Sequence, residues 1–273
     1  MTQQNDPELG QRIQAAGLDT NYHDLGSGSP VLLIHGSGPG VTAWANWRLT
    51  MPALAHTRRV IAPDMAGFGY TERRADVHYD MDFWVTHLIG LLDALEIEQT
   101  DLIGNSFGGA LALAMVVRYP HRVRKLVLMG AAGVKFELTH GLDAVWGYEP
   151  SVENMRGIMD IFAFDHSRIT PELVESRYRA SVRPGYQASF ASMFPAPRQR
   201  WIDALACDED ALRRIRHPTL IVHGREDRVI PLENSLRLNK LIGPSQLHVF
   251  GQCGHWTQIE HGDAFNCLVD DFL

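Results

Sequence analysis

The chain has 273 residues, of which 45% are hydrophobic, and its formal net charge is −7. This length allows one large buried core in a single α/β unit, and the negative charge argues against a nucleic-acid partner. The three cysteines are odd in number and have no metal-ligand spacing, which predicts a reduced, cytoplasmic chain. No apolar run is long enough to cross a membrane, and the polar start at residues 1–7 does not resemble a signal peptide.

Short apolar segments alternate with helical patterns along most of the chain. An antiparallel edge hairpin is predicted at residues 13–25. Strands are predicted at about residues 31–35, 59–63, 101–104, 125–130, 218–223 and 246–250. Helices are predicted at residues 82–95, directly after residue 106, and from residue 263. Such alternation is typical of an α/β fold in which helices cover both faces of a mostly parallel sheet.

The strand signal disappears between about residues 134 and 208. Four apolar residues from Met155 to Phe162 recur there at helical spacing, and Thr170 before Pro171 predicts a helix start. We therefore expect a helical cap inserted between two parts of an α/β core, with most of its Met and Phe side chains packed against the sheet. The predicted division is core at 1–133, cap at 134–208 and core again at 209–273.

A serine stands between a predicted strand and a predicted helix at residues 104–109, which read Gly-Asn-Ser-Phe-Gly-Gly. Glycine occupies the positions two before and two after Ser106, where a Cβ would collide with the neighbouring strand and helix. The pattern is typical of a nucleophile elbow, a tight turn that lifts the serine hydroxyl above the sheet. The motif alone also allows a small-residue turn with an incidental serine.

A serine nucleophile needs a base, and the base needs a group that orients it. Asp227 follows the strand predicted at 218–223 and His255 follows the strand predicted at 246–250, so both lie beyond the carboxyl ends of parallel strands. Asp64 also follows a strand, but it precedes a turn whose backbone an aspartate usually fixes. We therefore predict a catalytic triad of Ser106, Asp227 and His255, in the order nucleophile, acid, histidine.

A glycine-rich loop at residues 35–40 follows the first parallel strand and reads His-Gly-Ser-Gly-Pro-Gly. It lacks the lysine and the terminal serine or threonine of a phosphate-binding loop and the glycine spacing of a dinucleotide fold. An oxyanion hole fits better, with the backbone amides of Ser37 and Phe107 as the predicted donors. His35 is expected to order this loop and not to abstract a proton.

These motifs together resemble the α/β-hydrolase superfamily and, within it, the meta-cleavage-product hydrolases, which break carbon–carbon bonds in ring-fission products of aromatic degradation. The resemblance runs from about residue 20 to the end of the chain. Its specific segments are 35–47, 104–109, 192–201 and 254–256, whereas ordinary serine esterases share only the elbow. The full set is most similar to the branch acting on 2-hydroxymuconic semialdehyde and its small alkyl ketone relatives.

The resemblance implies a site for a small acidic dienoate, with no membrane and no nucleic acid involved. Arg177 resembles the family arginine that binds the carboxylate of the substrate, whereas composition alone favours a solvated helix face for it. Asn46, Asn105 and Trp256 match family residues on the polar side of the site, although each alone could serve loop hydrogen bonding or packing.

The chemistry of the family implies no metal or organic cofactor, because the substrate supplies its own electron sink. The 2-hydroxydienoate first ketonises, with His255 carrying a proton to carbon 5, and Ser106 then attacks the carbonyl at carbon 6. The expected products are 2-hydroxypenta-2,4-dienoate and formate or a short carboxylic acid. We expect a small group at carbon 6. The aromatic residues considered for the far end of the pocket are Tyr186, Phe190 and Phe194.

Other functions stay open on the sequence. A carboxylesterase or lactonase would use the same triad, and a non-catalytic ligand receptor can use the same fold. A dehalogenase or epoxide hydrolase fits poorly, because it needs a carboxylate nucleophile where this chain has Ser106. The sequence also leaves open a homo-oligomer and the choice between an acyl-enzyme and direct attack by water.

Overall fold

The computed structural model describes residues 6–74 and 77–273, so most of the polar start lies outside the described residues. In these residues an eight-stranded sheet has the order β1-β2-β4-β3-β5-β6-β7-β8. The strands are β1 (Gln11–Ala15), β2 (Leu18–Gly26), β3 (Pro30–Ile34), β4 (Arg59–Pro63), β5 (Thr100–Asn105), β6 (Val123–Met129), β7 (Thr219–Gly224) and β8 (Ser245–Phe250). β2 pairs antiparallel with β1 and β4, and the pairs from β4 to β8 are parallel. The predicted sheet and its edge hairpin are therefore confirmed.

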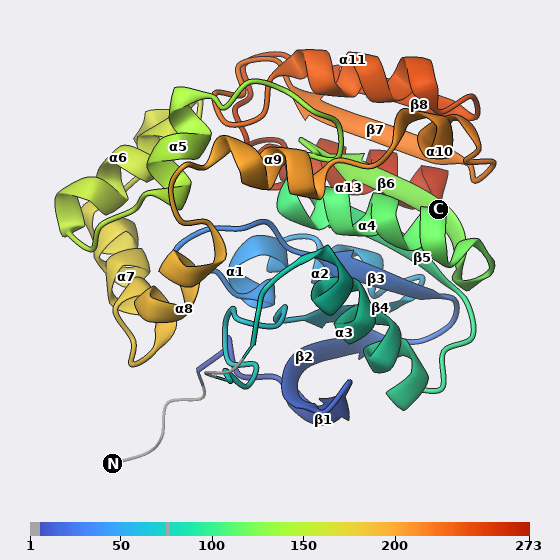
Figure 1. Ribbon diagram of the computed structural model, residues 1–273, viewed down its shortest axis with the longest axis horizontal. Helices are drawn as coiled ribbons and strands as arrows, with labels where there is room; N and C mark the ends of the chain where they lie inside the picture. Colours follow the sequence, from blue (N-terminus) through green and yellow to red (C-terminus); the bar gives the residue numbers. More distant parts are fainter. Residues whose placement is uncertain (1–5, 75–76) are drawn as a thin grey trace.

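Both faces of the sheet carry helices (Figure 1). Side chains alternate along each strand, so Leu32 and Ile34 of β3 face one layer while Val31 and Leu33 face the other. The first layer contains α3 (Met81–Ala94), α4 (Phe107–Arg118), α10 (Glu209–Arg213) and α11 (Leu232–Leu241). The second layer contains α1 (Ala43–Trp47), α2 (Met51–Leu54) and α13 (Gly262–Phe272). A short helix, α12 (Thr257–Glu260), precedes α13.

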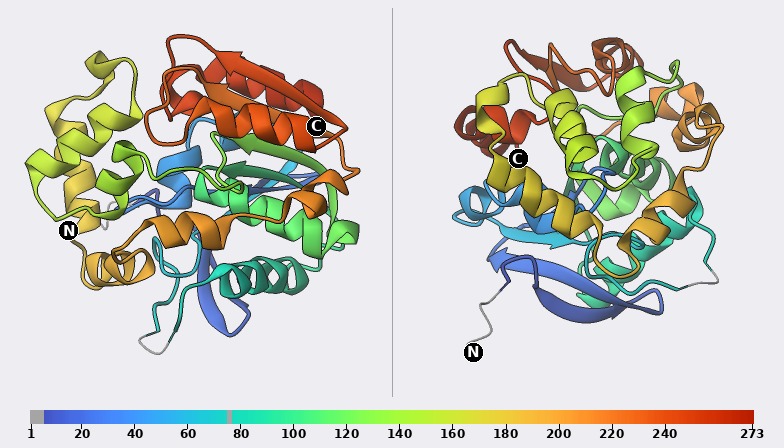
Figure 2. Two further views of the ribbon diagram at one scale, coloured as in Figure 1. Left: turned by 45° about the horizontal axis from the view of Figure 1, so that its top comes forward. Right: turned by 90° about the vertical axis from the view of Figure 1, so that its left-hand side faces the viewer.

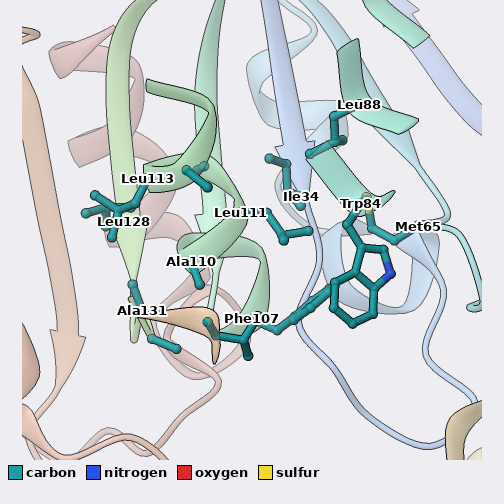
Figure 3. Packing of buried hydrophobic residues seen from close by; sticks show 14 of the residues in the cluster. Ile34, Met65, Trp84, Leu88, Phe107, Ala110, Leu111, Leu113, Leu128 and Ala131 are labelled. Atoms are coloured by element: carbon teal, nitrogen blue, oxygen red, sulfur yellow. The ribbon is translucent and has the colours of Figure 1, made fainter. Parts of the chain in front are cut away.

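The helix after Ser106 is anchored in the larger core. Phe107 begins α4, and its ring meets Trp84 of α3 edge to face, with centroids 4.6 Å apart (Figure 3). Ala110 and Leu111 of the next turn are fully buried beside Ile34 of β3. Burial of these side chains is the main favourable term that holds α4 against the sheet. The start of α4 is consequently a fixed point on which a reactive serine can be placed.

The connection from β6 to β7 is helical, as the sequence predicts. Before α10, its α-helices in the described residues are α5 (His140–Trp146), α6 (Val152–Phe162), α7 (Pro171–Ser181), α8 (Tyr186–Met193) and α9 (Gln199–Leu205), which together with the loops between them are called the helical segment. Thr170 caps α7, because its hydroxyl accepts a hydrogen bond from the Leu173 amide at 3.2 Å, and Pro171 follows in the first turn. Helices α5 to α8 gather at one end of the sheet (Figures 1 and 2). The division into core and cap at residues 134 and 208 remains a proposal.

No helix in the described part of the chain combines the length and the apolar character needed to cross a membrane.

Candidate active site

Ser106 occupies a strained turn between β5 and α4. Its backbone has φ 54° and ψ −115°, a conformation that residues other than glycine seldom adopt. Two backbone hydrogen bonds hold the turn: the Ser106 amide donates to the Met129 carbonyl at 2.9 Å, and its carbonyl accepts from the Ala132 amide at 3.1 Å. The turn is therefore fixed by β6 and the loop that follows it.

The glycines around Ser106 are required by close packing. A Cβ at Gly104 would lie 2.4 Å from the Gly108 carbonyl oxygen, and a Cβ at Gly108 would lie 2.2 Å from the Ile34 carbonyl oxygen. Both distances are far inside van der Waals contact, so neither position can carry a side chain without backbone movement. The collision with strand and helix that the sequence predicts is confirmed.

Asp227 and His255 form a buried pair beyond the ends of β7 and β8. The His255 Nδ1 lies 2.7 Å from Asp227 Oδ2, while Asp227 Oδ1 accepts hydrogen bonds from the amides of Val229 at 2.7 Å and Ile230 at 3.0 Å. Burial acts to raise the pKa of Asp227, but the charge and hydrogen bond of His255, with His223 nearby, outweigh it and hold the pKa below its ordinary value. The ionised carboxylate thus orients the ring with Nε2 as the nitrogen left for proton transfer.

The helical segment also holds His255, the predicted catalytic histidine. The His255 amide donates to the Phe162 carbonyl at 2.7 Å, and the two rings stack with centroids 5.5 Å apart. Phe162 is the last residue of α6, so the end of that helix supports the loop that carries His255. A displacement of α6 would therefore reach the reacting groups directly.

Gly130 is a site residue that the sequence analysis missed. It follows β6 with φ 48°, and a Cβ there would lie 3.2 Å from Asp227 Oδ2 and 3.3 Å from His255 Nδ1. Any side chain at this position would therefore press on the hydrogen-bonded pair. Its position directly after a strand at the active end of the sheet was the signal available in the sequence.

The glycine-rich loop is held by His35, as predicted. The ring is fully buried, its Nδ1 lies 2.8 Å from the Gly36 carbonyl oxygen, and its Nε2 accepts a hydrogen bond from the Met65 amide at 2.9 Å. Burial lowers the pKa of His35 to about 4, so the ring is neutral and has both nitrogens engaged. Asp64 fixes the neighbouring turn by accepting from the amides of Ala43 at 2.6 Å and Tyr70 at 2.7 Å.

The backbone amides of Ser37 and Phe107, the predicted oxyanion donors, have no partner among the described residues. Phe107 is the first residue of α4, where amides have no partner inside the helix and the helix dipole favours negative charge. The Ser37 hydroxyl accepts a hydrogen bond from Trp146 Nε1 of α5 at 3.0 Å, which ties the loop to the helical segment.

A cavity of about 460 Å³ lies over the serine. Ser106 and His255 both line it. The other predicted site residues on its wall are Ser37, Asn46, Asn105, Arg177 and Trp256. The structure therefore brings these predicted side chains to one space, whereas Phe107 is not among the described residues that line it.

Polar groups on the cavity wall include atoms without a partner. Asn46 Oδ1 accepts from the Gly36 amide at 3.0 Å, but its Nδ2 has no hydrogen-bond partner among the described residues. Gln258, which the sequence analysis missed, donates to the Asn46 carbonyl at 3.2 Å, and its Oε1 is likewise unpartnered in the described part of the chain. Arg48, Arg168 and Glu260 are further wall residues that were not predicted.

The apolar wall comes partly from the core, through Val41, Leu49 and Ile259, and partly from the helical segment. The side chains from the helical segment are Met155, Ile158, Met159, Phe162, Ile169 and Leu173. The three aromatic residues considered for the far end, Tyr186, Phe190 and Phe194, are not among the described residues that line this cavity, so that expectation is wrong. Phe194 instead stacks on Trp146 with centroids 4.3 Å apart.

Arg177 lies in α7 and reaches the cavity wall, so the solvated helix face favoured by composition does not describe it. Its side chain is 20% exposed, whereas that of Arg179, two residues later, is 73% exposed. One terminal nitrogen of Arg177 donates to Glu8 Oε1 at 2.6 Å. A guanidinium has five N–H donors, so this contact leaves others for a ligand in the cavity.

Comparisons with known proteins agree with this geometry. A family model described as alpha/beta hydrolase fold matches residues 29–262. The chain is 67% identical to a 2-hydroxy-6-oxo-2,4-heptadienoate hydrolase of Pseudomonas putida, over 97% of this chain and 96% of that protein. It is 65% identical to a 2-hydroxymuconate semialdehyde hydrolase of Pseudomonas sp. strain CF600, over 99% of this chain and 95% of that protein.

A solved structure gives the same result. The meta-cleavage product hydrolase from Pseudomonas fluorescens IP01 superposes with a TM-score of 0.97 at 61% identity, covering 97% of each chain. These findings confirm the resemblance inferred from the motifs. The chain belongs to the α/β-hydrolase family and, within it, to the meta-cleavage-product hydrolases.

Proposed function

We propose that this enzyme hydrolyses the bond between carbons 5 and 6 of 2-hydroxy-6-oxohexa-2,4-dienoates, namely 2-hydroxymuconic semialdehyde and its small alkyl ketone analogues. One observation carries the proposal: a single cavity holds Ser106 and His255 together with the guanidinium of Arg177. A nucleophile and a cationic group in one closed space suit a substrate that has a carbonyl at one end and a carboxylate at the other. The products are 2-hydroxypenta-2,4-dienoate and a short carboxylic acid.

The substrate is held at its acidic end. Arg177 binds the carboxylate through charge-assisted hydrogen bonds, and Asn46, Asn105 and Trp256 line the polar side near carbons 1 and 2. The free Nδ2 of Asn46 supports this role, because a buried amide donor without a partner costs stability unless a ligand or water satisfies it.

His255 first moves the proton of the 2-hydroxyl to carbon 5, which turns the dienol into a ketone with a remaining carbon–carbon double bond. Ser106 then attacks carbon 6 while His255 takes its proton. The negative oxygen that forms at carbon 6 is held by the amides of Ser37 and Phe107.

Collapse of this intermediate breaks the bond between carbons 5 and 6. The electron pair passes through the conjugated chain to the oxygen on carbon 2, and protonation there gives 2-hydroxypenta-2,4-dienoate. Water, deprotonated by His255, releases the acyl group from Ser106 as the carboxylic acid. One water is consumed, and the electron pair of the broken bond stays in the 2-hydroxypenta-2,4-dienoate product.

The test uses a panel of substrates whose carbon 6 carries hydrogen, methyl, isopropyl or phenyl. For each substrate, the loss of its visible absorbance is measured and both products are identified. We expect equal amounts of 2-hydroxypenta-2,4-dienoate and the matching acid. Much faster turnover of nitrophenyl esters than of any dienoate would support an esterase instead. Recovery of unaltered dienoate after long incubation would support a receptor.

We infer a cytoplasmic location from the cysteines, which are unpaired at Cys207, Cys253 and Cys267 in the described residues. A homo-oligomer stays a prediction that sedimentation of the purified protein tests.

A further inference from the structure

Glu8 is a buried carboxylate in the segment before β1. Its residue is only 6% exposed, and both of its oxygens contact arginines of the helical segment. Arg177 Nη2 donates to Oε1 at 2.6 Å, and Arg183 Nη1 donates to Oε2 at 2.8 Å. A carboxylate is seldom buried unless it is paired, and here two cations pair with it.

The backbone around Glu8 is fixed to the sheet. The Glu8 carbonyl accepts a hydrogen bond from Asn21 Nδ2 at 3.1 Å, and the Gly10 amide donates to Asn21 Oδ1 at 2.9 Å. Asn21 belongs to β2, and a Cβ at Gly10 would lie 2.1 Å from the Tyr22 carbonyl oxygen of the same strand. Glu8 is therefore fixed to the sheet, and it holds the side chains of Arg177 in α7 and of Arg183 just after that helix.

The two arginines on Glu8 differ in one respect. Arg177 is part of the cavity wall, whereas Arg183 is not among the described residues that line the cavity. Arg183 instead pairs with Asp6 at 3.4 Å and lies over the ring of Tyr70. The same carboxylate thus holds one guanidinium inside the site and one outside it.

We propose that Glu8 is a positioning residue for substrate recognition, which fixes the guanidinium of Arg177 at the carboxylate-binding end of the cavity. The inference rests on the role given to Arg177 in the proposed function. An arginine side chain loses much rotamer freedom when it binds a ligand, and a guanidinium that is already held loses less.

The ion pair between Arg177 and Glu8 does not remove the positive charge from the carboxylate-binding end of the cavity. Arg48 also lines it, so the wall keeps a second guanidinium beside Arg177. Burial lowers the pKa of Arg48, and the charge of Arg177 lowers it further, while the charge of Glu8 raises it. The three groups are therefore close enough to interact, with two positive charges and one negative charge.

The experiment compares Glu8→Gln, Arg183→Gln, Arg177→Gln and the double variant Glu8→Gln/Arg177→Gln. For each, kcat and KM are measured on the acidic dienoate and on a neutral nitrophenyl ester. Glu8→Gln should raise KM for the dienoate by about threefold to tenfold, the range of one hydrogen bond, with kcat and the ester rates little changed. Arg183→Gln, which removes the other partner of the same carboxylate, should leave both substrates within about twofold.

The double variant separates positioning from general stability. If Glu8 acts through Arg177, Glu8→Gln should have no further effect on KM once Arg177 is glutamine. An equal loss on both substrates, an equal effect of Arg183→Gln, or additive effects in the double variant would overturn the inference and make Glu8 structural. If Glu8→Gln fails to fold, Glu8→Asp, which keeps the charge on a shorter side chain, must show the same split.

The role of Arg177 is tested separately in the same set. If Arg177→Gln alone leaves KM for the dienoate unchanged, the carboxylate site of the proposed function is wrong, and the inference falls with it. If Arg177→Gln raises KM but Glu8→Gln does not, only the role of Glu8 is wrong.

Discussion

At the scale of single residues, the proposed mechanism divides the reaction between Ser106 and His255. Ser106→Ala removes only a hydroxyl from a rigid turn, so binding should persist while turnover falls by at least about a thousandfold. His255→Ala should lose both ketonisation and cleavage, whereas Ser106→Ala should keep part of the ketonisation. Stopped-flow spectra on the semialdehyde distinguish the two steps. Identical defects in the two variants would contradict the proton-carrier role of His255, and a Ser106→Ala enzyme within a few fold of the parent would contradict the nucleophile.

Arg177→Ala should damage recognition of the dienoate and spare the triad. A lost hydrogen bond to a charged group costs about 1.5–3 kcal/mol, which corresponds to roughly a tenfold to hundredfold loss in kcat/KM. Neutral nitrophenyl esters should react at the parent rate, because they have no carboxylate to bind. Equal losses on the acidic substrate and the neutral ester would show that Arg177 is structural.

Gly130→Ala should impair catalysis through the Asp227–His255 pair. The new methyl would lie 3.2 Å from Asp227 Oδ2, and φ 48° disfavours any residue but glycine, so the pair or the backbone has to shift. We expect kcat/KM to fall about tenfold or more, because small misplacements of catalytic groups are costly. The matched control is Gly157→Ala in α6, where a Cβ meets nothing within 4 Å. Parent activity in Gly130→Ala would show that the pair tolerates the contact.

Without the family resemblance, the site residues that could be predicted from the sequence are mainly those that follow strands. Asp227 and His255 lie just beyond β7 and β8, and a parallel sheet brings such positions together whatever the intervening chain does. Glu8 could not be predicted, because its contact with Arg177 joins residues 169 positions apart and no local pattern encodes it. Composition also could not separate Arg177 from Arg179, since both lie in α7 and only packing decides which one enters the cavity.

At the scale of elements, we expect α6 to limit the size of the substrate. Met155, Ile158, Met159 and Phe162 all come from this helix and line the cavity. A phenyl group on carbon 6 would have to displace these packed side chains. The free-energy penalty of such overpacking equals or exceeds the binding free energy that one methylene contributes. One methylene changes the transition-state energy by only about 1–3 kcal/mol, so preference among hydrogen, methyl and ethyl should be shallow.

We therefore expect efficient cleavage of the semialdehyde and the methyl ketone and poor cleavage of the phenyl ketone. The measurement is kcat/KM across the series, with Met159→Ala as the variant that enlarges the apolar wall and should improve the phenyl substrate relative to the methyl one. Equal kcat/KM of the parent enzyme on the phenyl and methyl ketones would mean that the cavity is longer than its wall residues indicate.

The elements that the sequence analysis predicted are those with a clear pattern of apolar residues, either a continuous run or a helical repeat. Strand β3 is a continuous apolar run, and α6 places its four buried residues on one helical face. The shortest helices, α2 and α12, have four residues each and no full apolar period, so only their tertiary contacts specify them. Phe194 shows the same limit: it is apolar and lies in the helical segment, but its stacking on Trp146 directs it away from the cavity.

At the scale of the whole molecule, two buried histidines make stability depend on pH. His35 and His87 each accept a backbone N–H from the turn after β4, from Met65 at 2.9 Å and from Ala66 at 3.3 Å. Burial lowers the pKa of both rings to about 4, with the charge of His35 adding to the effect at His87. In the unfolded chain a histidine titrates near pH 6.5. Between about pH 6.5 and pH 4 the unfolded state therefore binds more protons, and the free energy of unfolding falls as the pH falls.

Asp64 opposes this trend within part of the same range. Burial raises its pKa to about 6 against the hydrogen bonds from the amides of Tyr70 and Ala43, so between about pH 6 and pH 3.8 the folded state binds the extra proton. Its contribution to the free energy of unfolding therefore rises as the pH falls. One aspartate does not offset two histidines, and we expect these three groups together to lower the free energy of unfolding by an amount on the order of 3 kcal/mol between pH 7 and pH 4.

Urea unfolding at a series of pH values measures this loss as a shift in the midpoint. His87→Gln should flatten the curve, because glutamine can accept the Ala66 N–H without titrating, whereas His56→Gln at an exposed position should leave its slope unchanged. His35 holds the glycine-rich loop of the site. Irreversible loss of activity should therefore begin at the pH at which the protein begins to unfold. A free energy of unfolding that stays level or rises from pH 7 to pH 4 would show that the two rings are not held neutral.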